Sequence, residues 1–117
     1  MSKPNLRLSV RPLGGGCCAI DLFGEVTAFA ENSLMDAYTQ ATGAGATTLL
    51  LNFSGLEYMN SSGIGLLVTL LIRANRHTPR QRLLAVGLSE HYRQIFELTR
   101  LNEAIGIYAT EAEALAA

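Results

Sequence analysis

The chain has 117 residues, of which 49% are hydrophobic, and a formal net charge of −1. This length suits one domain with one core, and the apolar content excludes a disordered chain. The largest basic group, Arg76 with Arg80 and Arg82, is too small for the positive stripe that nucleic acids and anionic membranes attract. We therefore expect neither direct nucleic-acid binding nor a membrane surface as a partner.

Targeting and membrane segments are not expected either. The N-terminus opens no apolar run of signal-peptide length. The longest apolar stretch, residues 64–72, is far shorter than the roughly 20 residues that a bilayer span needs. These features predict a cytoplasmic protein without membrane insertion.

The two cysteines, Cys17 and Cys18, are neighbours in a strand-like run. Adjacent strand residues point to opposite faces, which disfavours a disulfide between them and predicts that one of the pair faces the core. A paired redox or metal site is the alternative, but no further Cys or His stands at suitable spacing, and His77 and His91 are isolated. We expect no metal and no cofactor.

The first half of the chain begins with a predicted hairpin. Apolar residues alternate over residues 6–11, three glycines (14–16) supply a turn, and residues 17–23 form a second, antiparallel strand. Residues 24–27 are expected to form a loop. Residues 28–42 are expected to be a helix whose apolar positions are Phe29, Leu34, Ala37, Tyr38 and Ala41, with glycine beyond its C-terminus.

The second half alternates strands with helices. Residues 47–53 are continuously apolar, which predicts a central strand covered on both faces, followed by a short loop. A helix over residues 61–76, a strand over 83–86, a helix capped by Ser89, a strand over 105–108 and a last helix capped by Thr110 follow. In the helix after Ser89 we expect Tyr92, Ile95, Phe96 and Leu98 to face inward.

The resulting element order is β-β-α-β-α-β-α-β-α. It predicts an α/β fold with a mixed, mostly parallel β-sheet and helices packed on it. No linker, repeat or low-complexity tract interrupts the sequence, so residues 1–117 are expected to form a single domain.

The candidate functional residues lie in the segment 60–65, where the helix that follows the central strand is predicted to begin. Asn60, Ser61 and Ser62 are of the types that cap helix N-termini, while Gly63 and Gly65 should leave an accessible surface around the two hydroxyls. A helix N-terminus tolerates a phosphate, which adds about −1.5 to −2 charges and could expel a partner docked there. On residue chemistry alone, a purely structural double-serine cap remains the simpler interpretation.

The same stretch resembles the signature of the STAS family, a domain shared by bacterial anti-sigma factor antagonists and sulfate transporter tails. Residues 52–56 (Asn-Phe-Ser-Gly-Leu) match the first part of that signature and residues 60–65 (Asn-Ser-Ser-Gly-Ile-Gly) match the second. Upstream, residues 23–27 (Phe-Gly-Glu-Val-Thr) resemble the family's Gly-Glu loop. The resemblance covers nearly the whole chain, because the predicted element order is also that of the family.

The resemblance implies an anti-sigma factor antagonist that works by partner switching. In this mechanism the unphosphorylated protein binds an anti-sigma factor that is also a serine kinase, phosphorylation of Ser61 breaks the complex, and a phosphatase restores it. Family members usually carry acidic residues where this chain has Thr27, Asn52 and Asn60. The residues expected to bind the partner are Gly24, Glu25, Thr27, Asn60, Ser62, Gly63, Ile64 and Leu67.

Several alternatives stay open. Residues 64–72 are apolar almost all round the helix, which favours burial, whereas an exposed rim near Ile64 and Leu67 would serve docking or a homodimer. Ser62 is the other candidate phosphate acceptor. The chain carries no nucleophile elbow, phosphate loop or complete dinucleotide fingerprint, so we expect no enzyme. Rival functions are a non-phosphorylated STAS subunit of a lipid-transporting ABC system, a scaffold of a signalling assembly and, more weakly, a binder of small ligands.

Overall fold

The computed structural model describes residues 5–117 as alternating strands and helices. The elements in chain order are β1 (Leu6–Gly14), β2 (Cys17–Val26), the 3₁₀ turn η1 (Ala28–Ala30), α1 (Glu31–Gly43), β3 (Thr48–Met59), α2 (Ser61–Arg76), β4 (Arg82–Val86), α3 (Glu90–Leu98), the 3₁₀ turn η2 (Leu101–Glu103), β5 (Gly106–Tyr108) and α4 (Glu111–Leu115). The predicted order of strands and helices is confirmed.

The five strands form one sheet in the order β1-β2-β3-β4-β5. β1 and β2 form the predicted antiparallel hairpin, and the remaining neighbours pair in parallel. β3 is the central strand, and Leu49, Leu50 and Leu51 are all 0% exposed. The expectation of a mixed, mostly parallel sheet with a doubly covered central strand is therefore confirmed.

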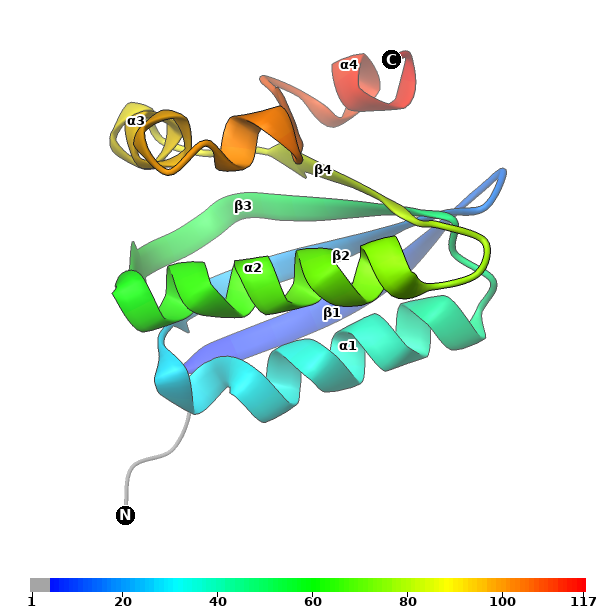
Figure 1. Ribbon diagram of the computed structural model, residues 1–117, viewed down its shortest axis with the longest axis horizontal. Coiled ribbons are helices and arrows are strands. Elements are labelled where there is room, and N and C mark those ends of the chain that lie inside the picture. Colours follow the sequence, from blue (N-terminus) through cyan, green and yellow to red (C-terminus); the bar gives the residue numbers. More distant parts are fainter. Residues whose placement is uncertain (1–4) are drawn as a thin grey trace.

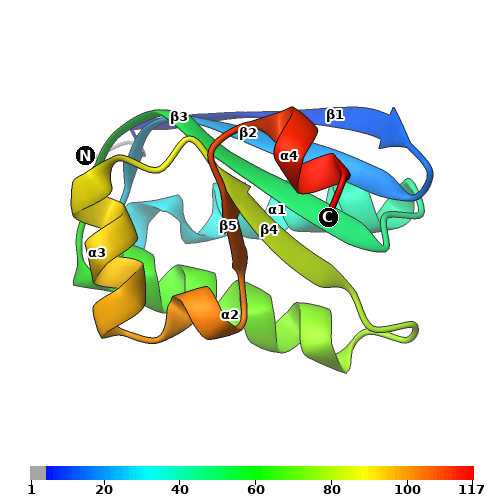
Figure 2. The ribbon, with the colours of Figure 1, turned by 90° about the horizontal axis from the view of Figure 1, so that it is seen from above.

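The helices cover the two faces of the sheet unequally (Figures 1 and 2). α1 and α2 lie against one face, and the main core between them includes Leu22, Leu51 and Leu67. The shorter α4 covers part of the other face, over a small cluster that contains Cys17, Ala19, Leu50, Leu84, Val86 and Ala114. α3 joins the main core through Phe96, whose ring meets the Phe53 ring edge-on at 6.1 Å.

Two predicted loops turn out to be strand. Of residues 24–27, the first three extend β2, and Thr27 alone precedes η1; residues 54–59 extend β3 instead of forming a loop. The reason is pairing: β2 and β3 continue to pair up to Val26 opposite Met59, across two register shifts. Strand partners far apart in sequence thus override the local turn signals carried by the glycines.

Two apolar side chains predicted to face inward are exposed, and both cysteines are buried where only one was expected to face the core. Phe29 is 61% exposed because it lies in η1, whose tighter turn does not share the period of α1. Leu98, the last residue of α3, is 85% exposed. Both cysteines are buried as free thiols, Cys18 in the main core and Cys17 in the cluster under α4, because both sheet faces are covered at that point.

Candidate functional site

The C-terminal ends of β2 and β3 meet at the end of the sheet where α2 begins (Figure 1). Met59 lies opposite Val26 in the last pair of the two strands. The next residue, Asn60, donates its backbone N–H to the Val26 carbonyl at 3.4 Å, and α2 starts at Ser61. The segment from Gly24 to Thr27 and the segment from Asn60 to Ile64 are therefore neighbours in space, as parallel strands require.

Asn60 is the N-cap of α2. Its backbone is extended, and its side-chain oxygen accepts from the Gly63 N–H at 2.9 Å. Ser61 and Ser62 follow as exposed residues of the first turn, which contains no acidic side chain. The Ser61 hydroxyl therefore lies in solvent at the positive end of a 16-residue helix.

The two glycines of this turn differ in role. Gly63 is buried, and a Cβ there would overlap the carbonyl oxygen of Val26 and lie 2.8 Å from Cγ of Met59. Gly65 faces open space, with nothing within 4 Å of an added Cβ. The expectation that both glycines expose the hydroxyls is wrong for Gly63, which instead lets α2 approach β2.

The residues expected to form a docking loop lie beside this turn. Gly24 has φ +116°, and a Cβ there would overlap the carbonyl oxygen of Asn5, so its role is close backbone approach. Glu25 is half-buried and donates its N–H to the same carbonyl at 2.8 Å. Thr27 caps η1 by accepting from the Phe29 N–H at 3.3 Å.

The predicted exposed rim on α2 has a different composition. Leu67 is 0% exposed and belongs to the core, so it cannot contact a partner; Ile64 is half-buried against the same core. On α2 itself the exposed large apolar side chains are Val68 (38%) and Ile72 (44%), further along the helix. Outside α2, Phe29 (61%) and Tyr58 (48%) are exposed and lie two residues from Thr27 and Asn60 in sequence. An aromatic residue beside each matched motif is the sequence signal that points to them.

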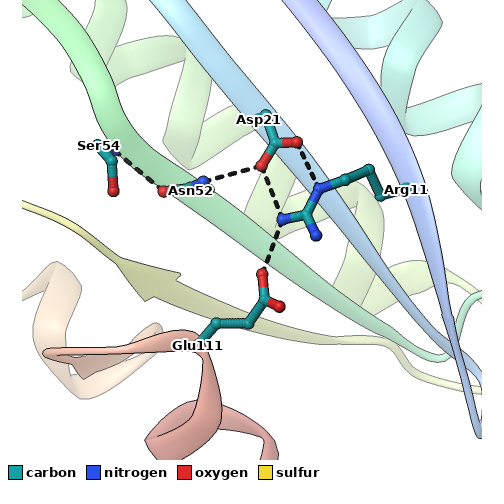
Figure 3. Close-up of polar contacts among 5 residues, drawn as sticks. All are labelled: Arg11, Asp21, Asn52, Ser54 and Glu111. Atoms are coloured by element: carbon teal, nitrogen blue, oxygen red, sulfur yellow. Dashed lines mark hydrogen bonds and ion pairs between the residues drawn. The ribbon is translucent and has the colours of Figure 1, made fainter.

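A second polar cluster links β1, β2, β3 and α4 (Figure 3). Asp21 is 6% exposed and forms a two-pronged ion pair with Arg11, with distances of 2.6 and 3.0 Å. Arg11 also reaches Glu111 at 2.7 Å, and Asn52 donates its amide to Asp21 at 2.9 Å. The Arg11 hydrogen bonds hold the pKa of Asp21 below its usual range.

This cluster gives Asn52 a role that residue-level reasoning missed. Its amide nitrogen donates to Asp21 while its oxygen accepts from the Ser54 N–H at 3.1 Å. A carboxylate at position 52 would face the Asp21 carboxylate without a proton between them. The available signal was Asp21 itself, a lone carboxylate in the apolar run of residues 17–23.

Residues 5–117 lack two features, a cluster of metal-ligating side chains and a helix of membrane-spanning character. No three His, Cys, Asp or Glu side chains of that region come together in a way that could hold a metal ion. None of its helices combines the length and apolar character needed to cross a bilayer.

The chain matches the sequence model of the STAS domain over residues 12–114 and therefore belongs to the STAS domain family. Its fold is similar to that of the anti-sigma factor antagonist SpoIIAA in its unphosphorylated form, with 24% identity, a TM-score of 0.71, and coverage of 94% of this chain and 96% of that chain. The phosphorylated form of SpoIIAA from Bacillus gives 26% identity, a TM-score of 0.68, and coverage of 94% and 97%.

An anti-sigma factor antagonist from Mycobacterium paratuberculosis has 20% identity, a TM-score of 0.79, and coverage of 99% of this chain and 97% of that chain. No curated protein matches this chain in sequence. The structural likenesses establish the SpoIIAA-like fold, and the family match establishes the kind of domain.

Proposed function

We propose that this protein is a cytoplasmic anti-sigma factor antagonist, acting as one domain over residues 1–117, that switches partners through phosphorylation of Ser61. The observation that carries the proposal is the position of Ser61: exposed, in the first turn of α2, beside the segment that follows β2. Its relative SpoIIAA is known in unphosphorylated and phosphorylated forms, which supports the same chemistry here.

In the unphosphorylated state, the partner docks across the exposed residues around Ser61. Thr27, Ser62 and Ile64 supply uncharged contacts, and Phe29, exposed two residues after Thr27, supplies apolar area for the interface. The partner class is an anti-sigma factor with serine kinase activity. The docked kinase is then positioned to transfer a phosphoryl group from ATP to the Ser61 hydroxyl.

Phosphorylation separates the two proteins without unfolding the domain. The N–H groups and partial positive charge at the start of α2 stabilise a phosphate locally. In the interface, however, about −1.5 to −2 new charges would have to lose water against an apolar partner surface, which drives dissociation. A phosphatase that removes the group restores binding.

Asn60 is compatible with this switch even though it is uncharged. It keeps the helix cap through its bond to the Gly63 N–H and places no carboxylate beside the phosphate. The first turn of α2 thus presents its positive end to Ser61 without an acidic neighbour.

The test uses the full chain with ATP and a candidate anti-sigma factor kinase from the same organism. Mass spectrometry should place one phosphate on Ser61 of the wild type and of Ser62→Ala, and none on Ser61→Ala. In binding measurements, Ser61→Asp should weaken the complex by roughly tenfold or more, because a charge is introduced into the interface. Gln40→Glu is the control, since it adds the same charge at an exposed position of α1 outside the proposed interface, and it should bind like the wild type.

A phosphate that remains on the Ser61→Ala variant would assign the switch to another residue. Equal affinity of Ser61→Asp and wild type would contradict release by charge. Either result would favour a STAS module that binds its partner without phosphorylation.

A further inference from the structure

The backbone leading into Ser61 is held from the side of α3. β4 pairs with β3 only as far as Val86 opposite Asn52, so residues 53–59 of β3 extend beyond it and, among the strands of residues 5–117, have only β2 as a neighbour. At the end of this extension, the Met59 N–H donates to the Tyr92 hydroxyl oxygen at 2.8 Å. A side chain of α3 thus takes the place of the missing strand partner.

Two hydrogen bonds hold the backbone just before the first turn of α2, one on the β2 side and one on the α3 side, and they differ in length. On the β2 side, the Asn60 N–H reaches the Val26 carbonyl at 3.4 Å, near the outer limit of a hydrogen bond. On the α3 side, the Met59 bond to Tyr92 is 2.8 Å long. The bond to Tyr92, one residue before the N-cap Asn60, is the shorter of the two.

α3 is a firm support for this hydroxyl. Phe96 of the same helix is 0% exposed and packs edge-on against Phe53 at 6.1 Å, which anchors α3 to β3 itself. Tyr92 is half-buried, one helical turn before Phe96, with the His91 ring 5.0 Å from its own. The hydroxyl is therefore carried by an element that cannot shift without disturbing the core.

We propose that Tyr92 is a positioning residue for Ser61, a role that rests on the proposed function of the same site. Its hydroxyl fixes the Met59 peptide, which fixes the Asn60 cap, which in turn sets where the first turn of α2 presents the Ser61 hydroxyl to a kinase. Without it, the N–H of Met59 lacks its acceptor at a residue whose side chain is buried, and the turn must move or admit water.

The first experiment compares Tyr92→Phe with Tyr108→Phe, a half-buried tyrosine of β5, by amide hydrogen exchange on the full chain. Tyr92→Phe should speed exchange at Met59 and Gly63 by roughly tenfold, because each depends on a bond in this chain of contacts. Exchange at Leu50, in the centre of β3, should stay as in the wild type. Unchanged exchange at Gly63 would overturn the proposal, because the cap would then be independent of Tyr92.

The second experiment measures Ser61 phosphorylation kinetics with the kinase partner. Because Tyr92→Phe removes no docking side chain but displaces the acceptor hydroxyl, kcat should fall several-fold while KM changes much less; a merely destabilised domain would not give this split. Tyr108→Phe should match the wild type in both constants.

The two proposals fail in different ways. A wild type that is never modified at Ser61 overturns the proposed function and the positioning role with it. A wild type modified at Ser61, with identical kinetics in Tyr92→Phe, overturns only the role of Tyr92.

Discussion

At three positions this chain has an uncharged polar residue where the STAS family usually has an acid, and each side chain makes a specific bond. Asn60 caps α2 by accepting from Gly63, and Thr27 caps η1 by accepting from Phe29. Asn52 uses its amide as a donor to Asp21, which a carboxylate could not do. Two of these residues, Asn60 and Thr27, therefore make capping bonds beside Ser61, and Asn52 makes its bond in the Asp21 cluster.

Replacing the N-cap tests its contribution to folding. Asn60→Ala should lower the free energy of unfolding by about 1 kcal/mol, because the Gly63 N–H loses its acceptor. Asn60→Asp should stay within a few tenths of a kcal/mol of the wild type, since aspartate caps equally well. Urea unfolding measures both, with Asn32→Ala on the exposed side of α1 as control. Equal losses in Asn60→Ala and Asn32→Ala would contradict a specific cap.

The Asp21 cluster predicts how stability responds to acid. Arg11 lowers the pKa of Asp21 in the folded state below the unfolded value of about 3.9. The ionised carboxylate therefore contributes stability at pH values above about 4, and this contribution is lost as the pH falls through the lower folded pKa. The free energy of unfolding, measured with denaturant between about pH 2 and pH 7, should rise with pH in the wild type. Its slope against pH should be shallower in Asp21→Asn. The same slope in both would contradict the assignment.

Among the elements, α2 combines a buried face with an exposed start. Leu67 and Leu70 are 0% exposed, whereas Ser61, Ser62 and Gly65 face solvent. This helix can lie close to β2 only because Gly63 has no side chain. The packing of the element and the presentation of the candidate acceptor are thus set by the same first turn.

Alanine at the two glycines should have opposite effects. Gly63→Ala should cost about 1–3 kcal/mol, because its Cβ meets the Val26 carbonyl, a backbone atom that cannot turn aside. Gly65→Ala should raise stability by about 0.5–1 kcal/mol, because its Cβ enters open space in a helix. Thermal and urea unfolding of both variants checks the pair. A stabilised Gly63→Ala would mean that α2 does not lie this close to β2.

On the scale of the whole molecule, the two faces of the sheet differ in how firmly they are covered. α1 and α2 close one face with long buried stripes. Of the helices within residues 5–117, only α4 covers the other face; it has five residues and is attached by buried Ala114 and by the 2.7 Å ion pair between Glu111 and the part-exposed Arg11. An exposed ion pair contributes about 0–1 kcal/mol, so we expect α4 to be released more readily than α1 or α2.

The rates at which the two cysteines react with a thiol reagent measure how firmly each face of the sheet is covered. Cys17 lies under α4 and Cys18 faces the main core. Burial raises the pKa of the Cys17 thiol and slows its reaction further. Glu111→Gln should speed labelling of Cys17 by a thiol reagent roughly two- to fivefold. The reason is that α4 loses an ion pair that stabilises its packing by up to about 1 kcal/mol. Labelling of Cys18, followed in a Cys17→Ser background, should not change; equal acceleration of both thiols would indicate general loosening.

Local sequence patterns determined the order of strands and helices, the mixed sheet, the central position of β3, and the caps at Asn60, Ser89 and Thr110. They could do so because side-chain periodicity and capping bonds act within a few residues. The same patterns singled out Ser61 and the STAS signature around it.

Only the tertiary structure decided which of those residues are accessible and what holds them. The extension of β3 to Met59, the burial of Gly63 and Leu67 and the exposure of Phe29 depend on which elements become neighbours. The Met59–Tyr92 bond spans 33 positions and the Arg11–Glu111 bond spans 100. Contacts at such separations follow from the topology of the sheet, which no local periodicity encodes.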